Sequence, residues 1–248
     1  SKSETVTNKV GSDAGSAVLV SATKTTTSAD GKTVTIERDS TGGGWYDQTE
    51  IRTTHADDSM TIVTTDRGSD GSVIRSSTET VSADGLTRTD AIDEDGDGTV
   101  DLTISHVIVV NADGSRSETI RYLNEDGSLR STVTETVSSD GRTKTIARDL
   151  DGDGDADVQE ELNITVNADK TTASTVTVKN GDGSVRSTTT QTQSEDALTK
   201  TTAVDQDGDG DVDMNTGEAT PQHAKDSRET MKTQTNTEGH VRGQAKRK

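Results

Sequence analysis

The chain has 248 residues, a formal net charge of −19 at pH 7 and a hydrophobic fraction of only 25%, whereas a typical globular domain has roughly 45–50% when Gly is counted. So little apolar material excludes a deep layered core, and the acidic balance excludes a nucleic-acid-binding surface, which has to be basic. The absence of Cys excludes disulfide bonds, and no apolar run approaches the roughly 18 residues of a membrane-spanning helix.

The composition indicates strands and turns rather than a disordered tail. Thr is abundant, and its branched Cβ favours the pleated surface of a strand. Disordered tails are usually rich in Pro, whereas this chain has a single proline, Pro221. Because the chain begins with Ser1 and not with Met, we interpret it as a piece of a longer or processed protein.

An acidic nonapeptide repeats along the chain. The segments Asp93–Asp101, Asp149–Asp157 and Asp205–Asp213 share the pattern D-x-D-G-D-G-x-x-D, and their first residues lie 56 positions apart. A weakened copy, Asp39–Asp47, precedes them. Self-similarity at a fixed period predicts a repeat architecture with atypical terminal copies.

Turn signals recur in the same register between the loops. Asn-x-Asp-Gly or its variants start at Asn111, Asn124, Asn167 and Asn180, and Ser-x-Asp-Gly or its variants start at Ser82, Ser138 and Ser194. Gly accepts a positive φ and Asp bonds to its own backbone, so these signals predict tight hairpin turns. The stretches between them predict half-buried strands. Glu79 and Glu135 recur at one strand position, where we expect them to pair with Arg or Lys across the strands.

We therefore predict an all-β fold, an antiparallel hairpin repeat array of about four 56-residue, four-stranded units, solenoid-like or propeller-like and calcium-stabilised. The predicted organisation is a degenerate N-terminal unit (1–38), a first repeat with the degenerate loop (39–92), a second repeat (93–148), a third repeat (149–204) and a fourth repeat that forms a degenerate C-terminal cap (205–248).

The acidic loops have the residue pattern of a calcium site. Ca²⁺ takes six to eight oxygen ligands, and carboxylates at positions 1, 3, 5 and 9 with the carbonyl at position 7 would supply them around a turn that Gly at position 6 permits. The predicted ligands are Asp93, Asp95, Asp97, Thr99 and Asp101; Asp149, Asp151, Asp153, Asp155 and Asp157; and Asp205, Asp207, Asp209, Asp211 and Asp213.

Other interpretations of the loops are less well supported. Magnesium prefers one or two carboxylates, and zinc prefers His or Cys. An EF-hand needs Glu at position 12, where the loops have Ile104, Glu160 and Thr216. A solvated acidic turn is the plain alternative. The loop at Asp39 has Thr41 and Gly43 in place of two carboxylates, so we expect weak binding or none there.

The D-x-D-G-D-G-x-x-D loops resemble the calcium loops of FG-GAP and VCBS-type repeats, and the Thr-rich hairpins with Asp-Gly turns resemble those of hemolysin-type, RTX-associated proteins of bacteria. The resemblance extends over most of the chain, from about Asp30 to Asp213. The Gly-rich RTX nonapeptide and the Phe-Gly pair are absent. The resemblance implies a secreted or cell-surface bacterial protein that folds when it meets calcium.

The functional expectation is an extracellular structural segment of an adhesin, fibre or surface protein, and not an enzyme, because none of the four His residues has a partner at a catalytic spacing. The expected partner is calcium, with self-assembly into filaments or a cell-surface glycan as further candidates. The alternatives are a carbohydrate- or protein-binding module and a non-catalytic region of a secreted enzyme or toxin. Trp45 and Tyr46 would either stack on a sugar or pack over the degenerate loop, and we favour packing.

Overall fold

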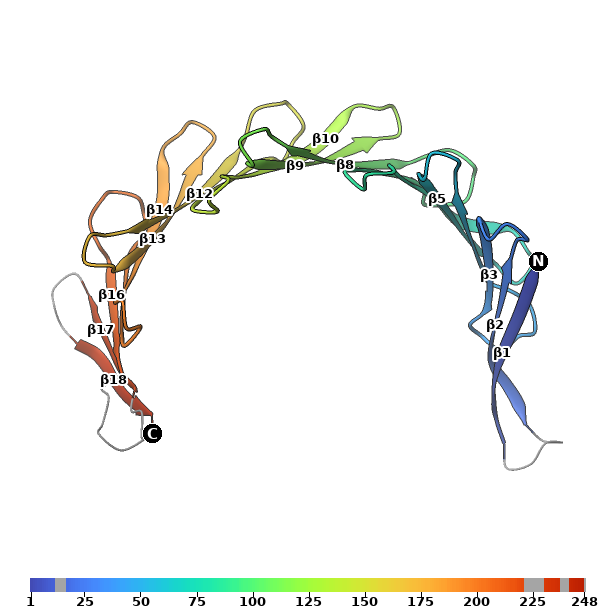
Figure 1. Cartoon of the computed structure of the whole chain (residues 1–248), viewed down its shortest axis with the longest axis horizontal. Helices are drawn as coiled ribbons and strands as arrows, with labels where there is room; N and C mark the ends of the chain where they lie inside the picture. Colours follow the sequence, from blue (N-terminus) through green and yellow to red (C-terminus); the bar gives the residue numbers. More distant parts are fainter. Residues whose placement is uncertain (12–16, 221–229, 237–240, 248) are drawn as a thin grey trace. The chain divides into compact units, whose positions relative to one another are not determined.

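The computed structural model describes residues 1–11, 17–220, 230–236 and 241–247, which form strands and turns and contain no helix. Eighteen strands follow one another along these residues (Figure 1). Their bounds are β1 Lys2–Val10, β2 Val18–Thr27, β3 Thr33–Asp39, β4 Gln48–Thr54, β5 Met60–Arg67, β6 Val73–Val81, β7 Thr87–Asp93, β8 Leu102–Val110, β9 Arg116–Asn124, β10 Leu129–Val137, β11 Thr143–Asp149, β12 Val158–Val166, β13 Thr172–Asn180, β14 Val185–Gln193, β15 Thr199–Asp205, β16 Met214–Ala219, β17 Thr230–Asn236 and β18 Val241–Arg247.

The chain divides into two compact bodies. The N-terminal body comprises Ser1–Val109 and Thr119–Ser131, and the C-terminal body comprises Val110–Glu118 and Thr132–Lys248. In the N-terminal body each strand from β1 to β8 pairs antiparallel with the next. In the C-terminal body the strands from β10 to β18 do the same. The predicted all-β antiparallel class is confirmed.

The hairpin turns lie where the sequence predicts them. In the turn at Ser82, Gly85 takes a φ of +70° and its N–H donates to the Ser82 carbonyl at 2.9 Å. Asp84 Oδ1 accepts from Ser82 Oγ at 2.6 Å and from the Leu86 N–H at 3.0 Å. These two bonds hold the pKa of Asp84 below its ordinary value of 3.8, and the bond from the Ser82 hydroxyl has the larger effect. Bonds of the same kind recur at Asp140 and Asp196.

Neither body has a buried hydrophobic core among the residues whose side chains are described. The buried residues there are acidic: Asp39, Glu50, Asp93, Asp149 and Asp205. Most strand side chains are half-buried, which agrees with the low apolar content. Order in the sheets therefore depends on ladder hydrogen bonds and on cross-strand side-chain pairs, because little apolar burial is present to offset the loss of backbone entropy.

The predicted cross-strand ion pairs are present. Arg88 Nε lies 3.2 Å from Glu79 Oε1, and Lys144 Nζ lies 2.8 Å from Glu135 Oε2. Partly exposed pairs of this kind contribute up to about 1 kcal/mol each, so they help to fix the register more than the stability.

The grouping of strands into four-stranded units, their closure and their stabilisation by calcium stay predictions. Within the described ranges, no helix has the length and apolar character needed to cross a membrane.

Candidate metal centres in the acidic loops

Each acidic loop joins two neighbouring strands and closes with one backbone hydrogen bond. The first Asp of the loop is the last residue of β7, β11 or β15. The N–H of the ninth Asp donates to the carbonyl of the residue before the first Asp: from Asp101 to Ile92 at 2.8 Å, from Asp157 to Arg148 at 2.8 Å and from Asp213 to Val204 at 2.9 Å. This bond brings the two ends of the nonapeptide side by side.

The first Asp organises the loop from inside. Asp93 is only 5% exposed, and its two carboxylate oxygens accept from the Gly96 N–H at 2.6 Å and from the Gly98 N–H at 3.1 Å. Both glycines have a positive φ, +78° and +93°, which turns their N–H groups toward the carboxylate. The same two bonds recur at Asp149 and Asp205.

The ninth Asp fixes the start of the loop. Asp101 Oδ2 accepts from the Glu94 N–H at 2.6 Å. Asp157 and Asp213 accept equivalent bonds from Leu150 and Gln206 at 2.7 Å. The first and ninth carboxylates thus satisfy backbone donors that the tight loop would otherwise leave without partners.

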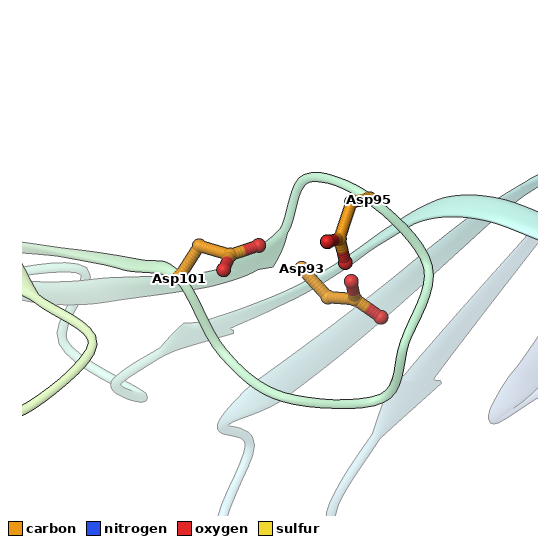
Figure 2. A group of neighbouring side chains, drawn as sticks. All are labelled: Asp93, Asp95 and Asp101. Atoms are coloured by element: carbon orange, nitrogen blue, oxygen red, sulfur yellow. The ribbon is translucent and has the colours of Figure 1, made fainter.

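The third Asp completes a cluster with the first and the ninth. Ligand oxygens of Asp93, Asp95 and Asp101 all lie within 4.8 Å of one another, and Figure 2 shows these three carboxylates inside one loop. The equivalent clusters are Asp149, Asp151 and Asp157, and Asp205, Asp207 and Asp213. Three carboxylates at this separation fit a hard cation that takes oxygen ligands.

The fifth Asp lies outside these clusters, although the sequence pattern includes it among the ligands. Asp97 Oδ1 accepts from the Thr99 N–H at 2.7 Å, which gives this side chain a local role in the turn. Asp153 and Asp209 accept in the same way from Asp155 and Asp211 at 2.8 Å. A role of the fifth carboxylates and of the seventh carbonyls as ligands stays a prediction.

The degenerate loop forms a similar turn without the third and fifth carboxylates. Asp39 is 2% exposed and accepts from the Gly43 and Gly44 N–H groups at 3.1 and 2.7 Å. Asp47 accepts from the Ser40 N–H at 2.9 Å. Burial opposes ionisation of Asp39, but the loop's hydrogen bonds together hold its pKa below the ordinary value. The turn therefore forms with Thr41 in the third position.

A glycine at position 4 is a requirement that the sequence interpretation missed. A Cβ on Gly96 would lie 2.3 Å from the Val73 carbonyl oxygen, and one on Gly208 would lie 2.1 Å from the Val185 carbonyl oxygen. A Cβ on Gly42 would lie 2.3 Å from the Leu19 carbonyl oxygen. The signal was present, because position 4 is Gly in all four loops.

No protein-family model matches the chain, and a search of curated proteins finds no match either. Any function has to be inferred from the residues of this chain, and the resemblance to secreted calcium-binding repeats stays a prediction.

Proposed function

We propose that the chain is a structural, calcium-binding repeat segment of an extracellular adhesin, fibre or surface protein, and that it does no catalysis. The observation that carries this proposal is the third carboxylate of each acidic loop. The degenerate loop closes with Thr41 in that position, where the Thr41 hydroxyl donates to Asp39 and Asp47 still accepts from the Ser40 N–H, so a carboxylate there is not needed to close the turn.

The third carboxylate is costly unless a cation offsets it. Two unit charges about 4 Å apart repel by about 1 kcal/mol in water and by about 4 kcal/mol at the effective dielectric constant near a protein surface. Each cluster has three carboxylates with oxygens within 4.8 Å of one another, and the chain carries a net charge of −19. A divalent ion in each loop would convert this repulsion into attraction.

Calcium suits the clusters better than other ions. Its flexible shell takes three carboxylates and completes itself with carbonyl oxygens or water, whereas Mg²⁺ demands near-octahedral geometry and keeps most of its waters. Zn²⁺ prefers nitrogen and sulfur ligands, and the clusters contain carboxylates alone.

Calcium binding would supply free energy that apolar burial does not. An ion that binds only the folded chain stabilises it by mass action. At low calcium inside a cell the loops would repel, and the described residues contain no buried hydrophobic side chain to compensate. Outside the cell, where sites of about 10⁻⁴–10⁻³ M affinity are filled, the sheet would become rigid. This dependence supports secretion or cell-surface display.

Calorimetric calcium titration and circular dichroism test the proposal on three forms of the full chain. The unmodified chain should bind calcium at three sites and should lose strand signal in EGTA. The combined variant Asp95→Asn, Asp151→Asn and Asp207→Asn should lose most of its affinity for calcium.

The chain offers a matched control for this experiment. The combined variant Asp84→Asn, Asp140→Asn and Asp196→Asn removes the same charge from hairpin turns outside the acidic loops, where Asn can accept the same hydrogen bonds, and should keep all three sites. If the unmodified chain takes up no calcium and its strand signal is indifferent to EGTA, the proposal is wrong.

A further inference from the structure

A cavity of about 360 Å³ lies beside the degenerate loop in the N-terminal body. Trp45, the single tryptophan of the chain, lines it together with residues of β3, β4, β5 and β6. The Trp45 indole lies against the backbone of the loop, because a Cβ on Gly43 would meet its Nε1 at 2.6 Å. Trp45 is half-buried as a whole residue.

Polar side chains on three paired strands line the same cavity. Arg38 Nη1 donates to Gln48 Oε1 at 2.7 Å, and Gln48 Nε2 donates to Asp66 Oδ1 at 2.8 Å. The strand register places these residues opposite one another, Arg38 with Gln48 and Gln48 with Asp66. The row is held by its own hydrogen bonds, so its donors and acceptors are positioned before any ligand arrives.

The other loops of the chain provide an internal comparison. The strand residue that follows the loop is Gln48 here, whereas it is Leu102, Val158 or Met214 after the acidic loops. The seventh loop position is Trp45 here, whereas it is Thr99, Asp155 or Asp211 there. An aromatic ring and a polar strand residue therefore replace non-aromatic and apolar ones at the same place, beside the loop that lacks the third carboxylate.

We propose that this cavity binds one ring of an uncharged oligosaccharide. An indole ring packs against the apolar C–H face of a sugar, and the sugar hydroxyls both donate and accept hydrogen bonds. Asp66 and Asp47 would accept from hydroxyl groups, and Arg38 and Arg67 would donate to hydroxyl or ring oxygens. A volume of about 360 Å³ is at the small end of ligand pockets, which suits a single ring.

The charges around the cavity favour an uncharged ligand. Arg38 and Arg67 contribute two positive charges, and Asp47 and Asp66 contribute two negative charges. Arg38 is also held at 2.9 Å from the buried Glu50 carboxylate, which lowers its capacity to attract an anion. A strongly acidic sugar would leave one of the aspartates beside a like charge.

Trp45 fluorescence gives a direct readout, because its emission has no other tryptophan source in the chain. The full chain in calcium is titrated with maltotriose, cellotriose and triacetylchitotriose as uncharged probes, and with trigalacturonate as the acidic probe. At least one uncharged probe should give a saturable change at millimolar concentration. Arg67→Ala and Gln48→Leu should each weaken that binding roughly tenfold or more. Arg67→Ala removes a donor to the sugar, and Gln48→Leu removes the side chain that positions Arg38 and Asp66.

Lys179→Ala is the matched control, since Lys179 occupies in β13 the position that Arg67 occupies in β5, beside the same kind of register shift. It should leave both the fluorescence change and the affinity unaltered. The proposal is overturned if no uncharged probe changes the emission, if trigalacturonate alone does, or if Arg67→Ala binds as well as Lys179→Ala while circular dichroism shows both folded.

Discussion

Replacement of Gly96 by Ala tests whether the fourth loop position is closed to any side chain. The new Cβ would lie 2.3 Å from the Val73 carbonyl oxygen and 2.7 Å from its carbon, which is closer than non-bonded atoms approach. Gly96 also has a φ of +78°, which L-residues rarely adopt. Gly98→Ala is the matched control, because Gly98 has a φ of +93° but no atom within 4 Å of the position of its Cβ.

The two variants separate backbone strain from the steric clash. The left-handed conformation alone costs roughly 1–2 kcal/mol for a residue with a Cβ, and this cost applies to both. The clash with Val73 requires a backbone shift that costs roughly 1–3 kcal/mol more. We therefore expect Gly98→Ala to lower the local free energy of opening by about 1–2 kcal/mol, and Gly96→Ala to lower it by about 2–5 kcal/mol.

Hydrogen exchange of the loop and of β7, measured in saturating calcium so that the sheet is folded in every variant, reports this local free energy. Each 1.4 kcal/mol corresponds to about a tenfold faster exchange. Gly98→Ala should exchange about tenfold faster than the unmodified chain, and Gly96→Ala at least thirtyfold faster, or roughly 2 kcal/mol. Equal exchange in the two variants would refute the reasoning, because the contact with Val73 would then impose no constraint.

Three further predictions follow from the turns, the degenerate loop and the buried carboxylate. The pKa of Asp84 and of similar turn carboxyls is lowered below 3.8, so the stability that they contribute is complete above that value and is lost as the pH falls through the lower folded pKa. The urea midpoint in saturating calcium should therefore be flat near neutral pH and fall below about pH 4, and a midpoint that stays constant to about pH 2 would contradict this. Thr41→Asp places a third carboxylate beside Asp39 and Asp47 and should add one calcium per chain by calorimetry, an expectation that unchanged stoichiometry would refute. Glu50→Gln removes the charge that pairs with Arg38 and Arg52 and should cost roughly 1–3 kcal/mol in urea unfolding, whereas an unaltered midpoint would show that the pair contributes nothing.

Local signals made the strands and turns predictable. The turn at Ser82 follows from Gly85 and Asp84, which need only their own backbone neighbours to adopt it. The strands follow because Thr-rich stretches lie between such turns. The contact of Glu79 with Arg88 was also predictable, because a hairpin fixes the register: Arg88 faces Val81, two residues along the strand from Glu79, and its long side chain reaches the carboxylate diagonally.

The content of the acidic cluster was only partly predictable. The residue pattern identified the loop, but it did not distinguish Asp97 from Asp95, since both are carboxylates two residues apart. Both side chains accept an N–H from the residue two positions on, so the distinction depends on how the whole loop folds, which brings an oxygen of Asp95 within 4.8 Å of Asp93 and Asp101. The need for Gly96 depends on Val73, which belongs to a different hairpin.

By itself, the sequence determined the class of fold, the positions of the turns and the three places where carboxylates gather, because each of these depends on residues within one hairpin or one nonapeptide. Only the tertiary structure decided that the first, third and ninth carboxylates form the cluster, because the bond from Asp101 to Ile92 is what brings the loop ends together. The tertiary structure also decided that Trp45 lines a cavity with Gln48 and Asp66, because only the pairing of β4 with β5 brings Asp66 beside Gln48.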